Sequence, residues 1–197
     1  MYNLKREGMN RKSLLFVIVV LISGTTLLRS QTAGNSTIDV IMSGYSAKMF
    51  SQEPVSGNDL DLILKCGMKA PSARNLQPWR FTVLKDNALT SQIISDITPG
   101  NVLVIISGLD SGQQGGSVDY DCGLATQNMY IAAQSLGLGA HIYWSPLGNI
   151  NSKKEAFGVP EGYRAVTVLR IGNIDKSVDA VSAASARKKF EEVVNYK

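Results

Sequence analysis

The sequence is poor in the residues that most metal sites and catalytic triads require. Its 197 residues include one histidine, His141, and two cysteines, Cys66 and Cys122, which stand far apart. A structural zinc site needs about four clustered ligands, and a nucleophilic triad needs a histidine beside a serine and a carboxylate. We therefore expect no metal site, and we interpret all three residues as structural. Any chemistry is expected to come from a bound cofactor.

The chain also lacks the basic patch that a nucleic-acid-binding protein would need. Its formal net charge is +4, but residues 1–30 hold five basic residues against one acidic residue, and basic and acidic residues balance in the remainder. No RNA- or DNA-binding motif occurs either. We expect no nucleic-acid partner, and we attribute the positive charge to targeting.

The basic segment precedes a short apolar run, which is the order found in an export signal. This run, residues 14–22, is shorter than the roughly 20 residues of a transmembrane helix. No clear cleavage site follows, so a cleaved signal peptide and an uncleaved membrane anchor both stay open, and Met9 is an alternative start to Met1. We assign 1–33 to this segment and its linker, and 34–197 to one folded domain. The protein is then exported or membrane-anchored, or cytoplasmic if the segment is not used.

Apolar stretches in the rest of the chain predict helices that pack on one sheet, the α/β or α+β class. We expect strands over 79–85, 102–107, 140–144 and 164–171. We expect helices over 37–44, 56–70, 87–97, 119–136 and 151–157, with Ser56 and Asn151 as N-caps. The run 102–107 is almost wholly apolar, which is typical of a strand that is buried on both faces.

A turn rich in polar residues joins the helix 56–70 to the strand 79–85. Pro71 disfavours helical backbone at the residue before it, and Pro78 stands just ahead of the strand. Between the prolines lie Ser72, Arg74, Asn75 and Gln77. Hydrogen-bonding groups held beside rigid elements suit recognition of a ligand that has many donors and acceptors.

The whole stretch 70–81 reads Ala-Pro-Ser-Ala-Arg-Asn-Leu-Gln-Pro-Trp-Arg-Phe. It resembles a loop of the nitroreductase family, the small dimeric oxidoreductases that depend on FMN. Residues 121–139 and 158–172 give two further matches, and the resemblance covers about 38–196. It implies a nitroreductase-like fold with a central, mostly antiparallel sheet and flanking helices. It also implies a homodimer that exchanges a C-terminal strand and binds FMN at each subunit interface.

The resemblance also implies which residues of this chain contact the flavin. The turn is expected to reach the flavin of the neighbouring subunit through Pro71, Ser72, Ala73, Asn75 and Gln77. The ring is expected to be flanked by Pro146, Leu147 and Gly148. The phosphate is expected to be held by Ser46, Lys48, Arg187 and Lys188.

One position departs from the family pattern. Members usually carry an arginine before the Tyr-Ser pair and another two residues after the serine, whereas this chain has Gly44 and Lys48 there. One charge of the phosphate site is therefore absent, and a bidentate guanidinium is replaced by a point charge. Arg187 is our candidate for the charge that Gly44 does not supply.

The implied activity is transfer of hydride from NADH or NADPH, through bound FMN, to a small oxidised acceptor such as a nitroaromatic or a quinone. No catalytic side chain is assigned, because flavin N5 carries the chemistry. Two alternatives stay open. One is different flavin chemistry, such as reductive dehalogenation. The other is an exported flavin-binding protein without turnover, which the absent arginine suggests.

Overall fold

The computed structural model describes residues 36–110, 117–177 and 186–197. The predicted signal or anchor, 1–33, lies outside the described residues. The chain divides into two units, 1–39 and 40–197, and the fold described below is that of the second. Helix α2, Ser36–Ser43, contains the boundary between the units and lies within one residue of its predicted bounds.

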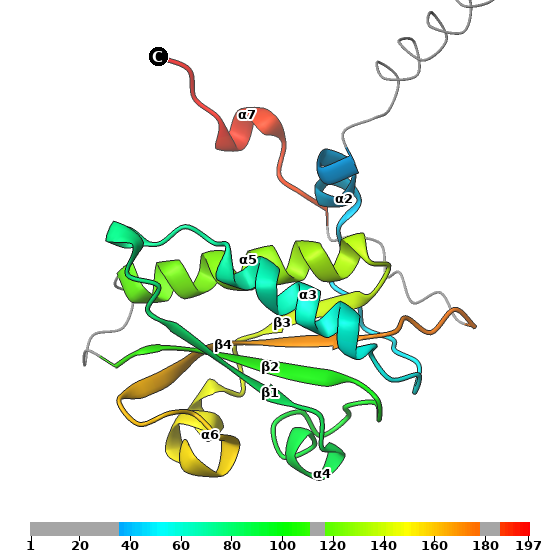
Figure 1. Ribbon diagram of the computed structural model, residues 1–197. Helices are drawn as coiled ribbons and strands as arrows, with labels where there is room; N and C mark the ends of the chain where they lie inside the picture. Colours follow the sequence, from blue (N-terminus) through cyan, green and yellow to red (C-terminus); the bar gives the residue numbers. More distant parts are fainter. Residues whose placement is uncertain (1–35, 111–116, 178–185) are drawn as a thin grey trace, which may run out of the picture. The chain divides into compact units, whose positions relative to one another are not determined.

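In the part of the chain that the structure describes, four strands form a single antiparallel sheet. They are β1 (Trp79–Leu84), β2 (Val102–Leu109), β3 (Gly139–Tyr143) and β4 (Tyr163–Gly172). Their order is β1-β2-β4-β3, so β3 lies at an edge (Figure 1). Every pairing among the described strands is antiparallel, which confirms the predicted sheet. β2 and β4 are central and almost entirely buried. β2 is almost wholly apolar, as a strand buried on both faces requires, whereas β4 also buries Arg164, Thr167 and Arg170.

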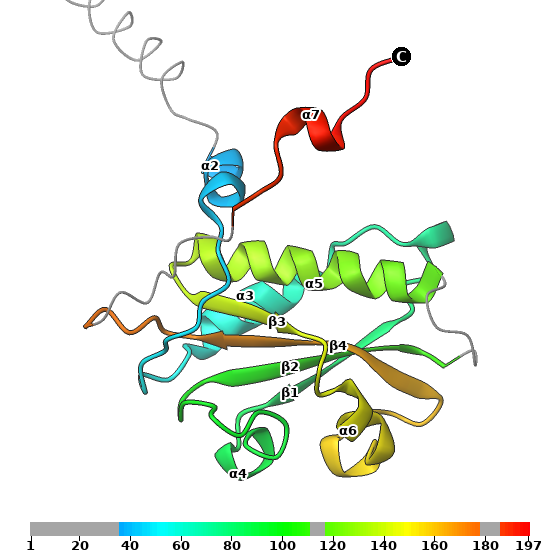
Figure 2. The same ribbon diagram turned by 180° about the vertical axis from the view of Figure 1, so that it is seen from behind.

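Helices cover both faces of this sheet (Figures 1 and 2). On one face lie α3 (Gly57–Met68) and α5 (Ser117–Ser135); on the other lie α4 (Asn87–Thr90) and α6 (Leu147–Ser152). Because side chains alternate along a strand, Val104 packs towards α3 and α5 while Ile105 packs towards α4 and α6. The sheet therefore separates two apolar cores.

The predicted ends of the two long helices are confirmed. Ser56 caps α3, since its Oγ accepts a hydrogen bond of 3.4 Å from the backbone N–H of Asp59. After α5 the chain turns at Gly137, whose φ of +76° places it in the left-handed region that glycine tolerates. Leu138 then donates its backbone N–H to the carbonyl of Ala133 at 3.0 Å. This turn leads directly into β3.

The prediction that Asn151 caps a helix over 151–157 is wrong. Asn151 lies inside α6, and its side chain pairs with the backbone of Ala165 on β4 through hydrogen bonds of 3.0 and 2.8 Å. A separate 3₁₀ turn, Glu155–Phe157, follows α6. A side-chain amide can replace a backbone partner at a distant strand as readily as at a helix start, so the local pattern misled.

Two further elements differ from expectation. α4 ends at Thr90 and is followed by turns, so it is shorter than the predicted helix 87–97. In the C-terminal segment, residues Phe190–Val193 form a short helix, α7, and exchange of a strand with a partner stays a prediction. Among the described residues, no helix is both long and apolar enough to cross a membrane.

Candidate functional site

The turn between α3 and β1 has an unusual backbone. Residues Ala73–Asn75 form a 3₁₀ turn, and Arg74, Asn75 and Gln77 have φ values of +54°, +57° and +48°. Residues other than glycine avoid this region at a cost of roughly 1–2 kcal/mol each, with asparagine tolerating it best. Such strain persists only where the surroundings hold the backbone in place, and it is common at binding sites.

Asp121 holds this turn from the first half of α5. Its carboxylate accepts the backbone N–H of Ala73 through both oxygens, at 3.1 and 3.2 Å, and the residue is only 3% exposed. Asp121 falls in the family match over 121–139, which assigns it no role. The available signal was a carboxylate on the apolar face of a helix, where an acidic residue is rarely buried without a partner.

Hydrogen bonds inside the turn bring several predicted residues together. The Oγ of Ser72 accepts the backbone N–H of Gln77 at 3.0 Å. The Nε2 of Gln77 in turn donates to Oδ1 of Asn75 at 3.2 Å. Pro71, Asn75 and Gln77 are exposed, so the turn presents polar groups outward from a fixed backbone.

A pocket of about 270 Å³ lies between α5, the segment after α2, and β3. It is lined by Ile41, Gly44, Ser46, Gln127, Tyr130, Ile131, Gln134, Ile142 and Arg187. Two of the four predicted phosphate residues, Ser46 and Arg187, thus line one pocket although they are far apart in sequence. Lys48 and Lys188 are exposed and do not line it.

A larger pocket, of about 700 Å³, lies where β3 ends and α6 begins. Leu147 and Gly148, two of the three predicted ring residues, line it together with Trp144, which is 71% exposed. Pro146, the N-cap residue of α6, lies between Trp144 and Leu147 in the sequence and is not among the lining residues. A Cβ built on Gly148 would meet no heavy atom within 4 Å, so the backbone there faces open space.

Residues two apart in the chain, at the end of the edge strand β3, line the two pockets. Ile142, in β3, lines the smaller pocket, and Trp144, directly after the last residue of β3, lines the larger one. Within β3, His141 and Tyr143 lie on the face opposite Ile142. The His141 Nδ1 is 2.9 Å from the carbonyl oxygen of Ala47, and its ring stacks on Tyr143 at 4.4 Å between centroids. This geometry agrees with a structural role for His141.

Charged residues meet beside the larger pocket. The guanidinium of Arg164, a residue only 9% exposed, donates to Asp119 on α5. Its Nε also lies 3.9 Å from an oxygen of Asp110, which accepts a 3.0 Å hydrogen bond from Lys154. Opposite charges therefore balance at this wall of the pocket.

The thiol of Cys122 remains protonated at neutral pH. A position near a helix start favours thiolate in principle, but burial raises the pKa of Cys122 to about 12, and the carboxylates of Asp119 and Asp121 add to the shift. Desolvation thus outweighs any stabilisation from the helix start. This result agrees with the structural interpretation of the residue.

Comparison with known proteins identifies the family. The model of the nitroreductase family matches residues 41–104 and 110–173, and the chain belongs to that family. A provisionally named NADH dehydrogenase/NAD(P)H nitroreductase from Archaeoglobus fulgidus is 30% identical over 149 residues, which are 68% of this chain and 83% of the relative. The family recognised from the sequence is therefore confirmed.

Solved structures give the same fold. A nitroreductase with bound FMN from Bacteroides fragilis has a TM-score of 0.69 and 21% identity, and the match covers 83% of this chain and all of the other. An FMN-dependent nitroreductase from Clostridium difficile has a TM-score of 0.64 and 25% identity, covering 82% of this chain and 99% of the other. The α+β architecture with its antiparallel sheet is thus that of the family.

Proposed function

We propose that this protein passes hydride from NADH or NADPH to a small oxidised acceptor by way of FMN bound along the edge strand β3. Family membership makes the chain an FMN-dependent oxidoreductase, as the sequence predicted. We add the proposal that the physiological acceptor is a small oxidised molecule such as a nitroaromatic compound or a quinone.

The observation that carries the proposal is the set of donors in the smaller pocket. The hydroxyl of Ser46, the guanidinium of Arg187 and the amide of Gln127 line one space. Gln134 also lines it, but its Nε2 donates to the carbonyl of Tyr45. Hydroxyl, amide and guanidinium groups are the donors that bind phosphate oxygens. The residues present therefore fit the phosphate end of FMN, and the larger pocket, which begins at Trp144 just beyond the end of β3, fits the ring.

In this proposal the protein binds, orients and shields the cofactor. Ser46 and Arg187 hold the phosphate, while Leu147 and Gly148 flank the ring with open backbone at Gly148. When bound, FMN supplies the centre that accepts and donates hydride. Trp144 gives the larger pocket an exposed aromatic surface against which a flat acceptor can pack. Differential contacts with the acceptor then set specificity.

We further propose a homodimer in which the turn 71–77 contacts the flavin of the partner subunit. The turn is fixed by Asp121 yet presents Asn75 and Gln77 to solvent. Groups that are held rigid but exposed in one subunit are suited to complete a site on another. Export or membrane anchoring through residues 1–33 stays a proposal that the described residues do not address.

The test is the visible absorption spectrum of the purified full chain, followed anaerobically during addition of NADH and then NADPH. We expect one FMN per subunit and bleaching by at least one donor. Recovery of the colour on addition of a quinone or a nitroaromatic compound would identify the acceptor class. A folded protein that takes up no FMN would overturn the proposal.

A flavin-binding protein without turnover is the second candidate. It is favoured by Gly44, which lacks the usual charge, and by Lys48, which does not line the pocket. This candidate predicts a bound flavin that neither nicotinamide donor bleaches. Reductive dehalogenation would instead appear as halide release in the same reduced samples.

A further inference from the structure

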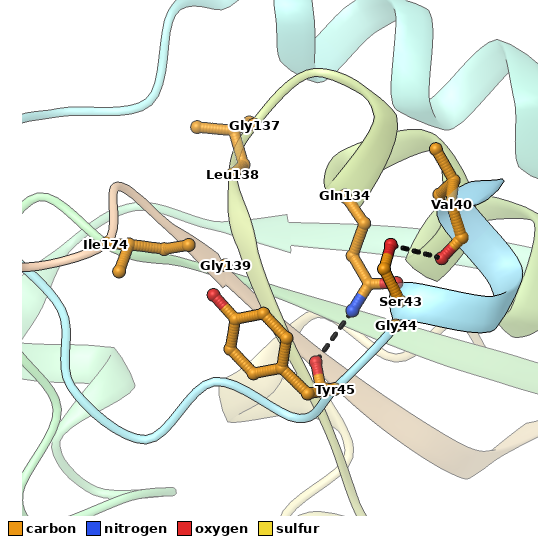
Figure 3. A pocket seen from close by; sticks show the side chains of 9 residues that line it. All are labelled: Val40, Ser43, Gly44, Tyr45, Gln134, Gly137, Leu138, Gly139 and Ile174. Carbon is orange, nitrogen blue, oxygen red and sulfur yellow. Dashed lines mark hydrogen bonds between the residues drawn. The ribbon is translucent and has the colours of Figure 1, made fainter. Parts of the chain in front are cut away.

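The segment that carries Ser46 is tied to α5 by one side chain. The Nε2 of Gln134 donates a hydrogen bond of 2.6 Å to the backbone carbonyl of Tyr45 (Figure 3). Tyr45 immediately precedes Ser46, so this bond fixes the backbone on one side of the hydroxyl. On the other side, Ala47 donates its N–H to the carbonyl of Ala140 at 3.1 Å. Ser46, which is exposed, therefore lies between two neighbours whose backbones are anchored.

Gly44 provides the space that Gln134 occupies. A Cβ at position 44 would lie 2.9 Å from Oε1 of Gln134, and 3.2 and 3.3 Å from the carbonyl oxygens of Val40 and Ile41. The φ of Gly44 is not positive, so the requirement for glycine comes from space rather than from backbone conformation. Any larger residue here, including the family's usual arginine, conflicts with Gln134 as it is placed.

Gly44 and Gln134 also form a wall shared by two pockets. Both line the pocket that contains Ser46 and Arg187. Both also line a third pocket, of about 180 Å³, together with Tyr45, Gly139 and Ile174 (Figure 3). Gly44 and Gln134 therefore border the proposed phosphate site next to the residue pair Tyr45 and Ser46.

We propose that Gln134 is a positioning residue for the phosphate end of the flavin and that Gly44 is the residue that permits it. The inference rests on the proposed function. The amide of Gln134 fixes Tyr45, Tyr45 directs Ser46 to the pocket, and Arg187 supplies the charge. In this chain the glycine is thus part of a different solution for binding phosphate, in which neutral donors stand where a second guanidinium is usual.

The test compares FMN with riboflavin, which has the same ring and no phosphate. Dissociation constants are measured by flavin fluorescence quenching for the full chain and for Gln134→Met, which keeps the length of the side chain and removes the donor. We expect the variant to bind FMN roughly five- to tenfold more weakly, the usual effect of one lost hydrogen bond. Its riboflavin affinity should change less than twofold, which also shows that it is folded.

Gln92→Met is the matched control. The Nε2 of Gln92 likewise donates to a backbone carbonyl, that of Ala88 at 3.1 Å, but it lies after α4 and lines neither pocket. This variant should keep both affinities. If Gln134→Met also keeps its preference for FMN, the bonds at Ala47 suffice to place Ser46, and the inference is wrong while the proposed function stands.

Gly44→Ala tests the coupling from the other side. The added methyl group would crowd Oε1 of Gln134 at 2.9 Å, and a small movement of that flexible side chain relieves the contact. The variant should therefore lose less FMN preference than Gln134→Met, and the double variant should lose no more than Gln134→Met alone. Losses that add fully would show that the two residues act independently and would overturn the coupling. A wild-type chain that binds neither flavin would instead refute the proposed function.

Discussion

Two segments of the candidate site are held in place in opposite ways. The turn 71–77 has three residues other than glycine with positive φ, and a buried carboxylate, Asp121, anchors it. The segment 44–47 has no positive φ, and the neutral amide of Gln134 together with pairing to β3 anchors it. A strained backbone needs a strong anchor, whereas a relaxed one is held by an ordinary hydrogen bond.

This difference shows how a family motif is kept or changed. The turn retains its whole motif, and its conformation depends on Asp121, which forms part of a separate match on α5. At position 44 this chain has glycine where the resemblance implies arginine, and Oε1 of Gln134 lies 2.9 Å from where a Cβ would stand. A change at one position of a packed site is thus understood only with the residue that it contacts.

Asp121→Ala should give the largest effect. It removes the acceptor for Ala73 and releases a turn that stores strain, so we expect a loss of about 2–3 kcal/mol in the free energy of unfolding. FMN affinity should fall on the order of a hundredfold. Urea unfolding measures the first quantity and fluorescence titration the second.

Asp61→Ala, at an exposed position of α3, is the control and should change stability by less than about 0.5 kcal/mol. Unchanged FMN binding in Asp121→Ala would show that the turn is not part of the site.

Arg187→Ala should have the next largest effect. Loss of a charged hydrogen bond to phosphate costs about 1.5–3 kcal/mol, which corresponds to a fall of roughly ten- to a hundredfold in FMN affinity with riboflavin affinity retained. Lys48→Ala should change FMN affinity much less, because Lys48 does not line the pocket. The reverse order of the two variants would move the phosphate site away from Arg187.

Much of the fold could be predicted from local sequence. The apolar run of β2 and the capped ends of α3 and α5 lie within about two residues of prediction, because burial and capping act between residues that are close in the chain. The prediction that Asn151 caps a helix failed for the opposite reason. Its partner, Ala165, is 14 residues away and on another element, so no local pattern reveals the contact.

The candidate site likewise contains residues that the sequence indicated and residues that it did not. The resemblance to the family indicated Ser46 and Arg187, which line one pocket, and Leu147 and Gly148, which line another. That these residues bind flavin stays a prediction. The resemblance did not indicate Gln134, whose bond to Tyr45 spans 89 residues, because anchoring contacts depend on packing that a motif does not describe. The resemblance indicated Lys48 and Arg187 alike, and of the two only Arg187 lines the pocket. Phosphate binding by either residue stays a prediction.

The pH dependence of stability tests the burial of Cys122, the residue next to the anchor Asp121. With a pKa raised from 9.0 to about 12, the folded chain keeps a proton that the unfolded chain releases above pH 9. The free energy of unfolding should therefore fall as pH rises from 9 to 12, by up to about 1.4 kcal/mol per pH unit from this group. Cys122→Ala should lack that part of the slope in urea unfolding between pH 8 and 10.5. Equal slopes in both proteins would mean that this part of α5 is open to solvent.

Arg74→Gly should give the smallest effect and the opposite sign. Arg74 is exposed, has a φ of +54°, and is not among the proposed flavin contacts, so glycine removes strain there without removing a contact. The gain is partly offset because glycine has more freedom in the unfolded chain. We expect a net stabilisation of about 0.5–1 kcal/mol, seen as a higher urea midpoint with an unchanged m-value and an FMN affinity within twofold. Lys65→Gly, in the regular helix α3, should instead destabilise by about 1 kcal/mol. If both variants destabilise alike, the turn is not strained, and the contrast between a strained segment and a relaxed one fails.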